Sequence, residues 1–466
     1  MEIAGILLSL VLLMYMAYKG FSVIFFAPVF ALLAAAFQGL PVMPSYTELF
    51  MGKAVVYIKT FFPIFLLGAV FGKVMEETLL AKSISSAIMK RLGKKRAVWA
   101  IVLSCAVLTY GGVSLFVVVF AVYPFAAELF KEADIPKRLI PGTIALGSFT
   151  FTMDAFPGTP QIQNIIPTSF YGTTSYAAPI AGLLGGTLIF LSGIWYLDWR
   201  RKIAQEKGEG YGSHTLNEPP SGQEAILPKW YIGLIPLFCV LCINLYFSRV
   251  FVWDSSGLEA LGGMKLPLMV SDVNRVVGIW SLIIALSIGI MSAGIIGFKN
   301  IPKRGGLQKT LTAGVAGSLL AIMNTASEVG YGNVIAALDG FKSISHFLIG
   351  IKIGGTPLVS EAVSITTLAG ITGSASGGLS IALDLMSKDW LSWANSIGMS
   401  PEILHRVASM ASGGFDTLPH NGAVITLLAV CGLTHKESYL DIGAITFMKT
   451  ALVFIIIAFY QLTGIY

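Results

Sequence analysis

Charged side chains are scarce in this 466-residue chain: Asp, Glu, Lys and Arg make up 12% of it, whereas hydrophobic residues make up 55%. A soluble domain carries about 25% charged residues, so the composition argues against a water-soluble protein. Histidine and cysteine are also few, with five and four residues. Because the chain lacks a metal-binding cluster and a nucleophile motif, an enzyme is not favoured, and no cofactor or metal is expected.

Two of the four cysteines, Cys239 and Cys242, form a C-x-x-C motif. This motif lies in the apolar run LIPLFCVLCINLYF without a second pair, so we interpret its cysteines as small residues that face lipid or core. The net charge of +6 is not accompanied by a basic patch interleaved with aromatic residues, so no nucleic-acid partner is expected. We assign the excess of basic residues to cytoplasmic loops.

The chain contains several long apolar runs. A helix needs roughly 20 apolar residues to cross a bilayer, and in lipid every backbone group must be satisfied internally. The runs do not alternate in polarity as barrel strands do. Clear candidates are residues 3–18, 21–37, 177–197, 230–251, 276–298 and 442–462. The predicted class is an all-α polytopic protein that crosses the lipid bilayer of the plasma (inner) membrane several times.

Basic clusters predict the orientation of these helices, because Lys and Arg concentrate in cytoplasmic loops. The clusters are KRLGKKR, KEADIPKR, DWRRK and FKNIPKRGGLQK, at residues 90–96, 131–138, 198–202 and 298–309. If all four are cytoplasmic, the apolar stretch 98–130 must enter and return on one side, turning at YGGVS (110–114). We therefore predict a re-entrant hairpin there. A second one is predicted over 357–385, broken at TGSASGGLS (372–380), and both termini are predicted to be external.

Two halves of the chain echo each other at offsets of 260 to 266 residues. The matches are Gly72 with Gly332, SIS (83–85) with SIS (343–345), YGGVS (110–114) with SGGLS (376–380), DAFP (154–157) with DTLP (416–419), and Gly172 with Gly432. In the predicted topology the two copies point in opposite directions. Inverted repeats with paired discontinuous helices are the build of secondary transporters.

The predicted organisation follows from the repeat and the charge pattern. It comprises N-terminal transmembrane helices over 1–53, repeat 1 over 54–198 with its hairpin at 98–130 and a broken helix at 139–171, a cytoplasmic linker over 199–228, connecting helices over 229–309, and repeat 2 over 310–466 with its hairpin at 357–385 and a broken helix at 403–433.

Each repeat interrupts an apolar helix with polar residues, at FTMDAFPGTPQIQN (151–164) and GGFDTLPHNGAVIT (413–426). Helix N-termini at such breaks offer free N–H groups that suit a carboxylate, and glycines at the hairpin tips let a ligand approach the backbone. No Lys or Arg lies in the breaks, so we expect neutral donors plus a proton or cation to hold a small organic anion. The predicted substrate-binding residues are Thr109, Gly111, Gly112, Ser114, Thr159, Asn164, Ser374, Ser376, Gly377, Gly378 and Asn421.

Ionisable residues inside a membrane are functional candidates by default. The predicted proton-coupling candidates are Asp154, Asp416, Glu328 and His420. An alternative for the two aspartates is that each caps the helix that restarts after its break. For Glu361 we expect a backbone amide or Lys352 as the partner, and for His405 and Arg406 a solvated helix end.

The stretches SGGFDTLPHNGAVITLLAVCGLTHKESY (412–439) and GSASGGLSIALDLM (373–386) resemble the gluconate:proton symporter (GntP) family, part of the ion-transporter superfamily that includes citrate and dicarboxylate carriers. The resemblance spans essentially the whole chain. It implies proton-coupled uptake of a small organic acid by a homodimer with an elevator-like mobile domain. The break DTLPHNGAV is more similar to the 3-hydroxybutyrate-type branch than to true gluconate permeases. The Ser-Asn-Thr hairpin signature of sodium-coupled members is absent, which favours protons.

The leading hypothesis is a proton-coupled symporter of a small organic (hydroxy)carboxylate such as gluconate or 3-hydroxybutyrate. A sodium-coupled di- or tricarboxylate symporter is the alternative. An anion channel is less favoured, because a pore needs a continuous polar path, whereas the two polar breaks are enclosed.

Overall fold

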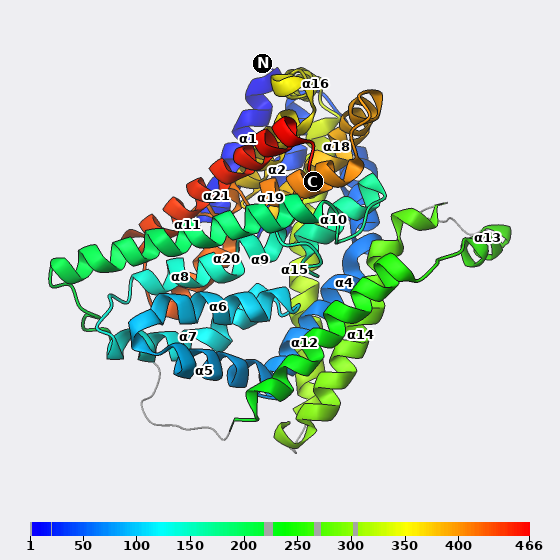
Figure 1. Ribbon diagram of the computed structural model, residues 1–466. Coiled ribbons are helices and arrows are strands. Elements are labelled where there is room, and N and C mark those ends of the chain that lie inside the picture. The colour runs from blue at the N-terminus through cyan, green and yellow to red at the C-terminus, as the bar shows by residue number, and fades with distance from the viewer. Residues whose placement is uncertain (1, 20, 219–226, 265–271, 302–305) are drawn as a thin grey trace.

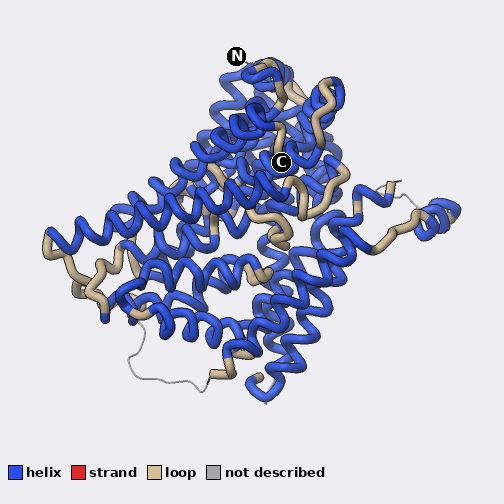
Figure 2. The backbone as a smooth tube through the Cα atoms, viewed as in Figure 1, coloured by secondary structure: helices blue, strands red, loops and turns tan. Residues whose placement is uncertain are grey.

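The computed structural model describes residues 2–19, 21–218, 227–264, 272–301 and 306–466, and in these ranges it contains helices and loops but no strand (Figure 2). The all-α class is therefore confirmed. Parts of three predicted segments lie outside the described residues: 219–226 of the linker, 265–271 of the connecting helices and 302–305 of a basic run.

Figure 1 shows the order of the helical elements along the chain. Those of the first half are α1 (Glu2–Tyr18), α2 (Val23–Phe37), α3 (Val42–Pro44), η1 (Ser45–Phe50), α4 (Met51–Glu77), α5 (Leu80–Leu92), η2 (Lys94–Arg96), α6 (Ala97–Tyr110), α7 (Leu115–Glu132), α8 (Leu139–Ser148), α9 (Phe151–Asp154), α10 (Ile162–Tyr171) and α11 (Pro179–Glu206). Those of the second half are α12 (Trp230–Leu245), η3 (Tyr246–Val250), α13 (Ser256–Gly263), η4 (Val273–Arg275), α14 (Val277–Gly297), η5 (Phe298–Asn300), α15 (Gly306–Ala336), α16 (Asp339–Ile349), η6 (Ile353–Gly355), α17 (Leu358–Thr372), α18 (Ala375–Ser396), α19 (Pro401–Ser412), η7 (Phe415–Thr417), α20 (Gly422–Cys431) and α21 (His435–Thr463).

Within the described residues, five helical stretches are long and apolar enough to cross a membrane. They are 42–77, 179–206, 230–250, 277–300 and 435–463. The first of them joins α3, η1 and α4 into one continuous rod, so the domain boundary that the sequence places at residue 53 falls inside a helix. These lengths and compositions fit a multi-pass membrane protein.

Helices α4 and α15 pack along each other, next to α12 and α14, and these four helices lie together in Figure 1. Glycines allow the close approach. A Cβ atom on Gly314 of α15 would lie 2.9 Å from the Val70 Cα of α4, and one on Gly330 would lie 2.8 Å from the Phe50 carbonyl oxygen. Since the residue numbers run in opposite directions along the two helices, α4 and α15 are antiparallel.

Both predicted hairpins are pairs of helices that pack against each other, α6 with α7 and α17 with α18. Their turns fall at residues 111–114 and 373–374. The second half of each interrupted helix crosses to the other half of the chain: α10 packs against α18 and α19, and α20 packs against α7 and α8. This reciprocal packing brings the two interruptions towards each other.

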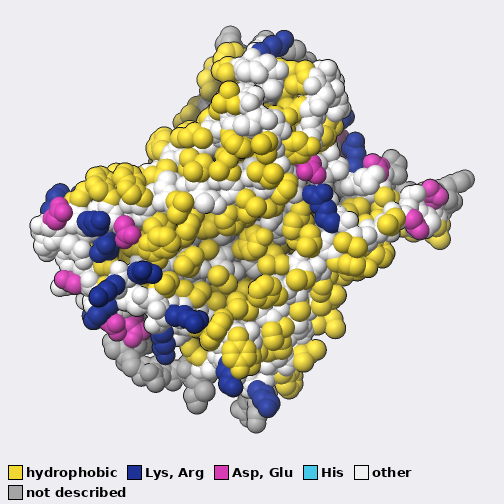
Figure 3. All heavy atoms as spheres, in the orientation of Figure 1, with side chains coloured by type: hydrophobic (Ala, Val, Ile, Leu, Met, Phe, Trp, Pro, Cys, Tyr) yellow, Lys and Arg dark blue, Asp and Glu magenta, His cyan; other side chains and the backbone are white. Residues whose placement is uncertain are grey.

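The face drawn in Figure 3 is largely hydrophobic, with Lys and Arg side chains gathered along its lower left rim. Two of the predicted basic clusters meet at Asp441, because Arg138 and Arg200 both bind it, at 3.3 and 2.7 Å. Arg138 also donates to both carboxylate oxygens of Glu209, which lowers the pKa of that carboxyl below its ordinary value. A broad apolar belt with charges at one edge is the pattern expected of a protein in a bilayer.

The α4–α15 contact predicts a difference between two glycines on one helix. Gly314→Leu should destabilise the protein by about 1–3 kcal/mol, because the new side chain meets the α4 backbone and forces the helices apart. Gly317→Leu is the matched control, since nothing lies within 4 Å of a Cβ there. The thermal unfolding midpoint of purified protein in detergent measures both. Equal midpoints for the two variants would contradict the tight contact.

Candidate functional site

Two interrupted helices form the centre of the candidate site. Helix α8 ends at Ser148 and α10 begins at Ile162, while α19 ends at Ser412 and α20 begins at Gly422. The chain between them contains prolines, which lack an N–H group and cannot continue a helix, and it contains Gly158 with φ of +83°. Both gaps between helices lie in or next to the polar stretches 151–164 and 413–426.

Each hairpin tip is tied to the interruption that follows it in the chain, and the two ties match. Gln161 Nε2 donates to the Thr109 carbonyl oxygen at 2.8 Å, and Asn421 Nδ2 donates to the Gly373 carbonyl oxygen at 2.8 Å. Gln161 and Asn421 are separated by the repeat offset of 260. The Tyr110 hydroxyl adds a bond to the Pro157 carbonyl oxygen at 2.8 Å. These amides fix the tips against the interruptions.

The two interruptions meet at three buried ionisable residues, Asp154, Asp416 and Lys449. We call this cluster the junction. Lys449 of α21 is 1% exposed, forms an ion pair with Asp154 and donates to the Phe149 carbonyl oxygen at 3.1 Å. The buried Asp416 interacts electrostatically with both Lys449 and Asp154. A side chain on Gly413 would overlap the Asp154 and Lys449 side chains. Glycine is therefore required at this position for the two interruptions to meet.

Arg406 and His405 lie beside the junction with 0% exposure, so their predicted placement at a solvated end is wrong. Arg406 donates to the carbonyl oxygens of Ala177 and Asp154 and to Asn164 Oδ1 at 2.7 to 3.3 Å. It also interacts electrostatically with Asp154. The guanidinium therefore binds carbonyl groups that the first interruption leaves without helical partners.

A second polar cluster, which we call the tip cluster, lies where the tip of the α17–α18 hairpin meets α15. Glu328 of α15 is 5% exposed, and its Oε2 lies so close to Gly377 that a side chain there would overlap it. Ser374 caps α18 by accepting from the Gly377 N–H at 3.1 Å and lies close enough to Glu328 to interact with it. Ser376 shares a hydrogen bond with Thr325 at 3.2 Å. Serine hydroxyls and one carboxylate thus surround the first turn of α18.

The α6–α7 hairpin tip makes mostly apolar contacts. Thr109 is fully buried and its hydroxyl has no partner among the described residues. A Cβ on Gly111 would meet Leu237 of α12, and one on Gly112 would meet Pro160. Ser114 begins α7 without a capping hydrogen bond from its side chain. This tip holds fewer polar groups than the tip cluster.

Several predicted ligand residues use their polar atoms within the protein. Asn164 donates to the Thr159 and Ser175 carbonyl oxygens while its Oδ1 accepts from Arg406, and the Thr159 hydroxyl donates to the Thr152 carbonyl oxygen. Asn421 Oδ1 accepts from the N–H groups of Ala423 and Val424 at 2.6 and 2.9 Å. These side chains support the interrupted backbone.

The remaining predicted residues lie around the second tip. Gly378 packs against the backbone of Ala369, so it serves the contact between α17 and α18. His420 lies against Gly373, and its Nε2 has no partner among the described residues.

The predicted residues therefore do not gather at one point. Ser114 lies against Gly72 of α4, whereas Ser380 lies near Tyr57 of the same helix. These two positions of α4 are fifteen residues apart, or about 22 Å at 1.5 Å per residue. The second interruption connects the junction to the second hairpin tip. It contains Asp416 and, four residues later in the sequence, His420, which lies against Gly373.

Two further expectations are corrected by the structure. Neither aspartate caps a restarting helix, since Gln161 and Asn421 occupy the cap positions of α10 and α20. Glu361 is buried and accepts a hydrogen bond from the Tyr171 hydroxyl instead of binding Lys352.

Sequence reasoning missed Lys449 because it lies outside both interruptions, in the run MKTALVFIII of α21. A lone lysine within an apolar span was the available signal, since such residues are rare and functional.

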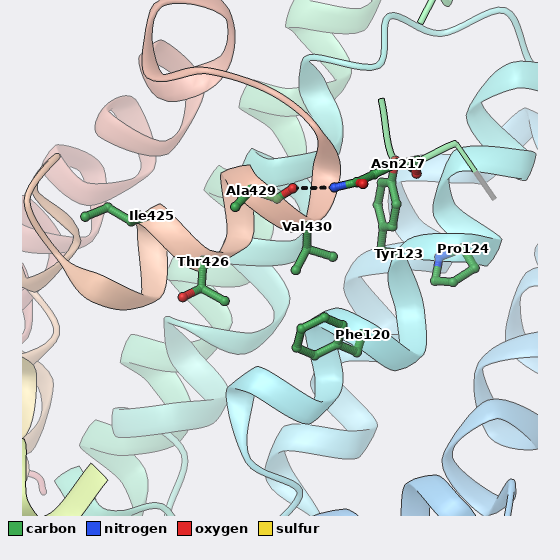
Figure 4. Close-up of a pocket in the computed structure, with 8 residues that line it drawn as sticks. All are labelled: Phe120, Tyr123, Pro124, Asn217, Ile425, Thr426, Ala429 and Val430. Atoms are coloured by element: carbon green, nitrogen blue, oxygen red, sulfur yellow. Dashed lines mark hydrogen bonds between the residues drawn. The ribbon is translucent and has the colours of Figure 1, made fainter. Parts of the chain in front are cut away.

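A cavity of about 670 Å³ lies apart from these clusters, between α7 and α20 (Figure 4). It is lined by Phe120, Tyr123, Pro124, Asn217, Ile425, Thr426, Ala429 and Val430. Asn217 closes one side by donating to the Ala429 carbonyl oxygen at 2.7 Å. Its mainly apolar lining does not suit an organic anion.

The junction predicts that removing the lysine costs far more than removing one acid. Lys449→Met should destabilise the protein by about 3–5 kcal/mol, because two buried carboxylates lose their shared amine. Asp416→Asn should cost little, since Lys449 keeps Asp154. The thermal unfolding midpoint in detergent measures both, and Lys449→Met combined with Asp154→Asn should recover part of the loss. A midpoint for Lys449→Met equal to that of the unmodified protein would refute the junction.

Comparison with known proteins agrees with this architecture. The family profile described as GntP family permease matches residues 1–249. The chain is 52% identical to the uncharacterized transporter YxjC of Bacillus subtilis (strain 168), over 100% of both chains. The fold is similar to that of the Alcanivorax borkumensis YdaH transporter, with a TM-score of 0.54, 12% identity and 88% of each chain covered. It is also similar to that of Neisseria gonorrhoeae MtrF, with a TM-score of 0.53, 11% identity and 94% of each chain covered. The chain is therefore a membrane transporter that belongs to the GntP permease family.

Proposed function

We propose that this protein is a proton-coupled symporter of a small organic (hydroxy)carboxylate, such as gluconate or 3-hydroxybutyrate. The family supports transport of a small molecule across the membrane. The choice of a carboxylate and a proton rests on the buried polar groups.

The observation that carries the proposal is the set of ionisable groups where the two interruptions meet. Asp154, Asp416 and Lys449 are each at most 5% exposed in a chain that is mostly apolar. Charges in a membrane interior are costly and are kept where a protein moves ions or charged solutes. A carboxylate substrate and a proton together add no net charge to such a site, which suits a carrier that must cross a low-dielectric layer.

The helix N-termini support a carboxylate as the cargo. Helix α18 begins at the second hairpin tip, and α20 begins at the second interruption. The first turn of each helix carries the partial positive charge that stabilises anions. Serine hydroxyls of the tip cluster provide neutral donors for hydroxyl and carboxylate oxygens. A site of this kind holds an anion without a dedicated cation, so it can also release it.

The membrane arrangement is part of the proposal. We take both hairpins as re-entrant and the two halves as inverted repeats, which the matched Gln161 and Asn421 ties and the reciprocal packing of α10 and α20 support. The basic rim is assigned to the cytoplasm and both termini to the outside. The homodimer and the elevator-like movement are proposed from the family resemblance.

Uptake into proteoliposomes tests the function. The purified protein is expected to accumulate labelled gluconate or 3-hydroxybutyrate when the lumen is more alkaline than the outside, and to do so with equal sodium on both sides. Citrate and succinate serve as the comparison acids. Empty vesicles and vesicles treated with a protonophore are the controls. Accumulation that requires a sodium gradient would replace the proton with sodium, and downhill flux without accumulation would indicate a channel.

A further inference from the structure

The junction is balanced in charge without a proton. Two carboxylates, Asp154 and Asp416, are there, and two cations act on them: Lys449 on both, and Arg406 on Asp154. Each junction carboxylate thus has at least one cation that acts on it, although only Asp154 forms an ion pair with Lys449.

Glu328 has no such balance. It is 5% exposed, forms no ion pair with a described residue, and its Oε2 has no hydrogen-bond partner among the described residues. An isolated charge is costly to hold in a low-dielectric interior. Of the acids around the two interruptions and the hairpin tips, Glu328 is thus the one that lacks a counter-charge.

The groups that face Glu328 are neutral on each helix packed against it. Ser374 before α18 lies close enough to interact with it, and Tyr57 of α4 interacts with it electrostatically. Helix α2 carries no titratable residue. Of the charged residues on the packed helices, Lys53 of α4 and Asp384 of α18 pair with each other at 2.8 Å, and Lys59 of α4 is exposed. Glu48 of η1 is exposed, and Asp339 lies at the start of α16, beyond the end of α15.

Glu328 lies beside the start of a helix. Its Oε2 lies against Gly377 in the first turn of α18, where any side chain would overlap it. The N-terminal turn of a helix is where a carboxylate is stabilised by free N–H groups and the helix dipole. The structure thus places one of the protein's own carboxylates beside a turn that suits an anion, with its Oε2 still without a hydrogen-bond partner among the described residues.

We propose that Glu328 is a tethered competitor of the substrate, whose ionised carboxylate occupies the first turn of α18 until a proton neutralises it and the substrate carboxylate takes its place. The inference rests on the proposed function and names its coupling residue. The proton enters from the external solution, stays on Glu328 during transport, and leaves when the substrate is released inside. Because the ionised side chain excludes the substrate, a proton and a substrate bind together, and each raises the affinity for the other by the same factor.

The experiment compares Glu328→Gln with the unmodified protein in proteoliposomes, using whichever labelled acid the unmodified protein accumulates, gluconate or 3-hydroxybutyrate. Apparent affinity is measured by substrate exchange at a series of pH values that are equal on both sides. In the unmodified protein, affinity should weaken about tenfold per pH unit on the alkaline side, as linkage to one proton requires. In Glu328→Gln, exchange should persist with a flat pH profile, and accumulation driven by a pH gradient should be lost.

Glu361→Gln is the matched control, because Glu361 is also a buried glutamate of the second half and its amide oxygen would still accept from Tyr171. This variant should keep the pH dependence and the accumulation of the unmodified protein. Retained pH dependence in Glu328→Gln would overturn the inference while leaving the proposed function in place. The same holds if Asp416→Asn, and not Glu328→Gln, flattens the profile. Unmodified vesicles that accumulate none of the acids would overturn both proposals.

Gly377→Ala provides a second variant that keeps the acid. Its methyl group would overlap Glu328 Oε2 and displace the carboxylate from α18. Because the substrate carboxylate is proposed to take the same place, the methyl group should also weaken the affinity for substrate, and it should do so in the Glu328→Gln background as well. Unchanged substrate affinity in Gly377→Ala would place the substrate carboxylate elsewhere, which would overturn the inference.

Discussion

The buried ion pair between Lys449 and Asp154 is the interaction on which the arrangement of the two interruptions depends. Separating such a pair inside an apolar interior leaves two unpaired charges, so the pair holds its elements together strongly. Because Asp154 lies in the first interruption and Lys449 in α21, the pair fixes the last long helix to the first half of the chain. The second interruption can reach it only because residue 413 is glycine.

The fold could be predicted from the sequence where a local signal was strong. Prolines and glycines within apolar runs marked both interruptions. The glycine pair at 111–112 marked the first hairpin turn, whereas the pair at 377–378 lies in the first turn of α18, just after the second hairpin turn at 373–374. Helix ends were less accurate: α18 runs to Ser396 although the hairpin was predicted to end at 385, and a boundary at 53 cut a continuous helix. Helical periodicity does not reveal where a helix ends when both flanks are apolar.

The candidate site could be predicted only in part, for a physical reason. Sequence identifies polar groups within a break, but it does not show which groups from distant helices reach them. Lys449 comes from a helix almost three hundred residues after Asp154 in the chain, and Arg406 was assigned to solvent because it lies near a helix start. Asn164 and Asn421 were predicted to bind substrate, yet their amides bind the backbone that the interruptions expose. A broken helix in lipid needs such internal partners before it can offer any group to a ligand.

The two halves share a frame but not a charge pattern, and this difference bears on coupling. At the offset of 260 residues, Glu328 corresponds to Gly68, Arg406 to Leu146 and Lys449 to Ile189, so three ionisable groups have apolar or small counterparts in the first half. If the two halves also had the same charged residues, both hairpin tips would present equivalent groups to the substrate. With Glu328 at one tip, the tips differ: one turn is occupied by an internal carboxylate, while the other faces Leu237 and Pro160. In the mechanism we propose, proton dependence arises at the second hairpin tip alone. The first half then serves as the support against which the second half exchanges the Glu328 carboxylate for that of the substrate.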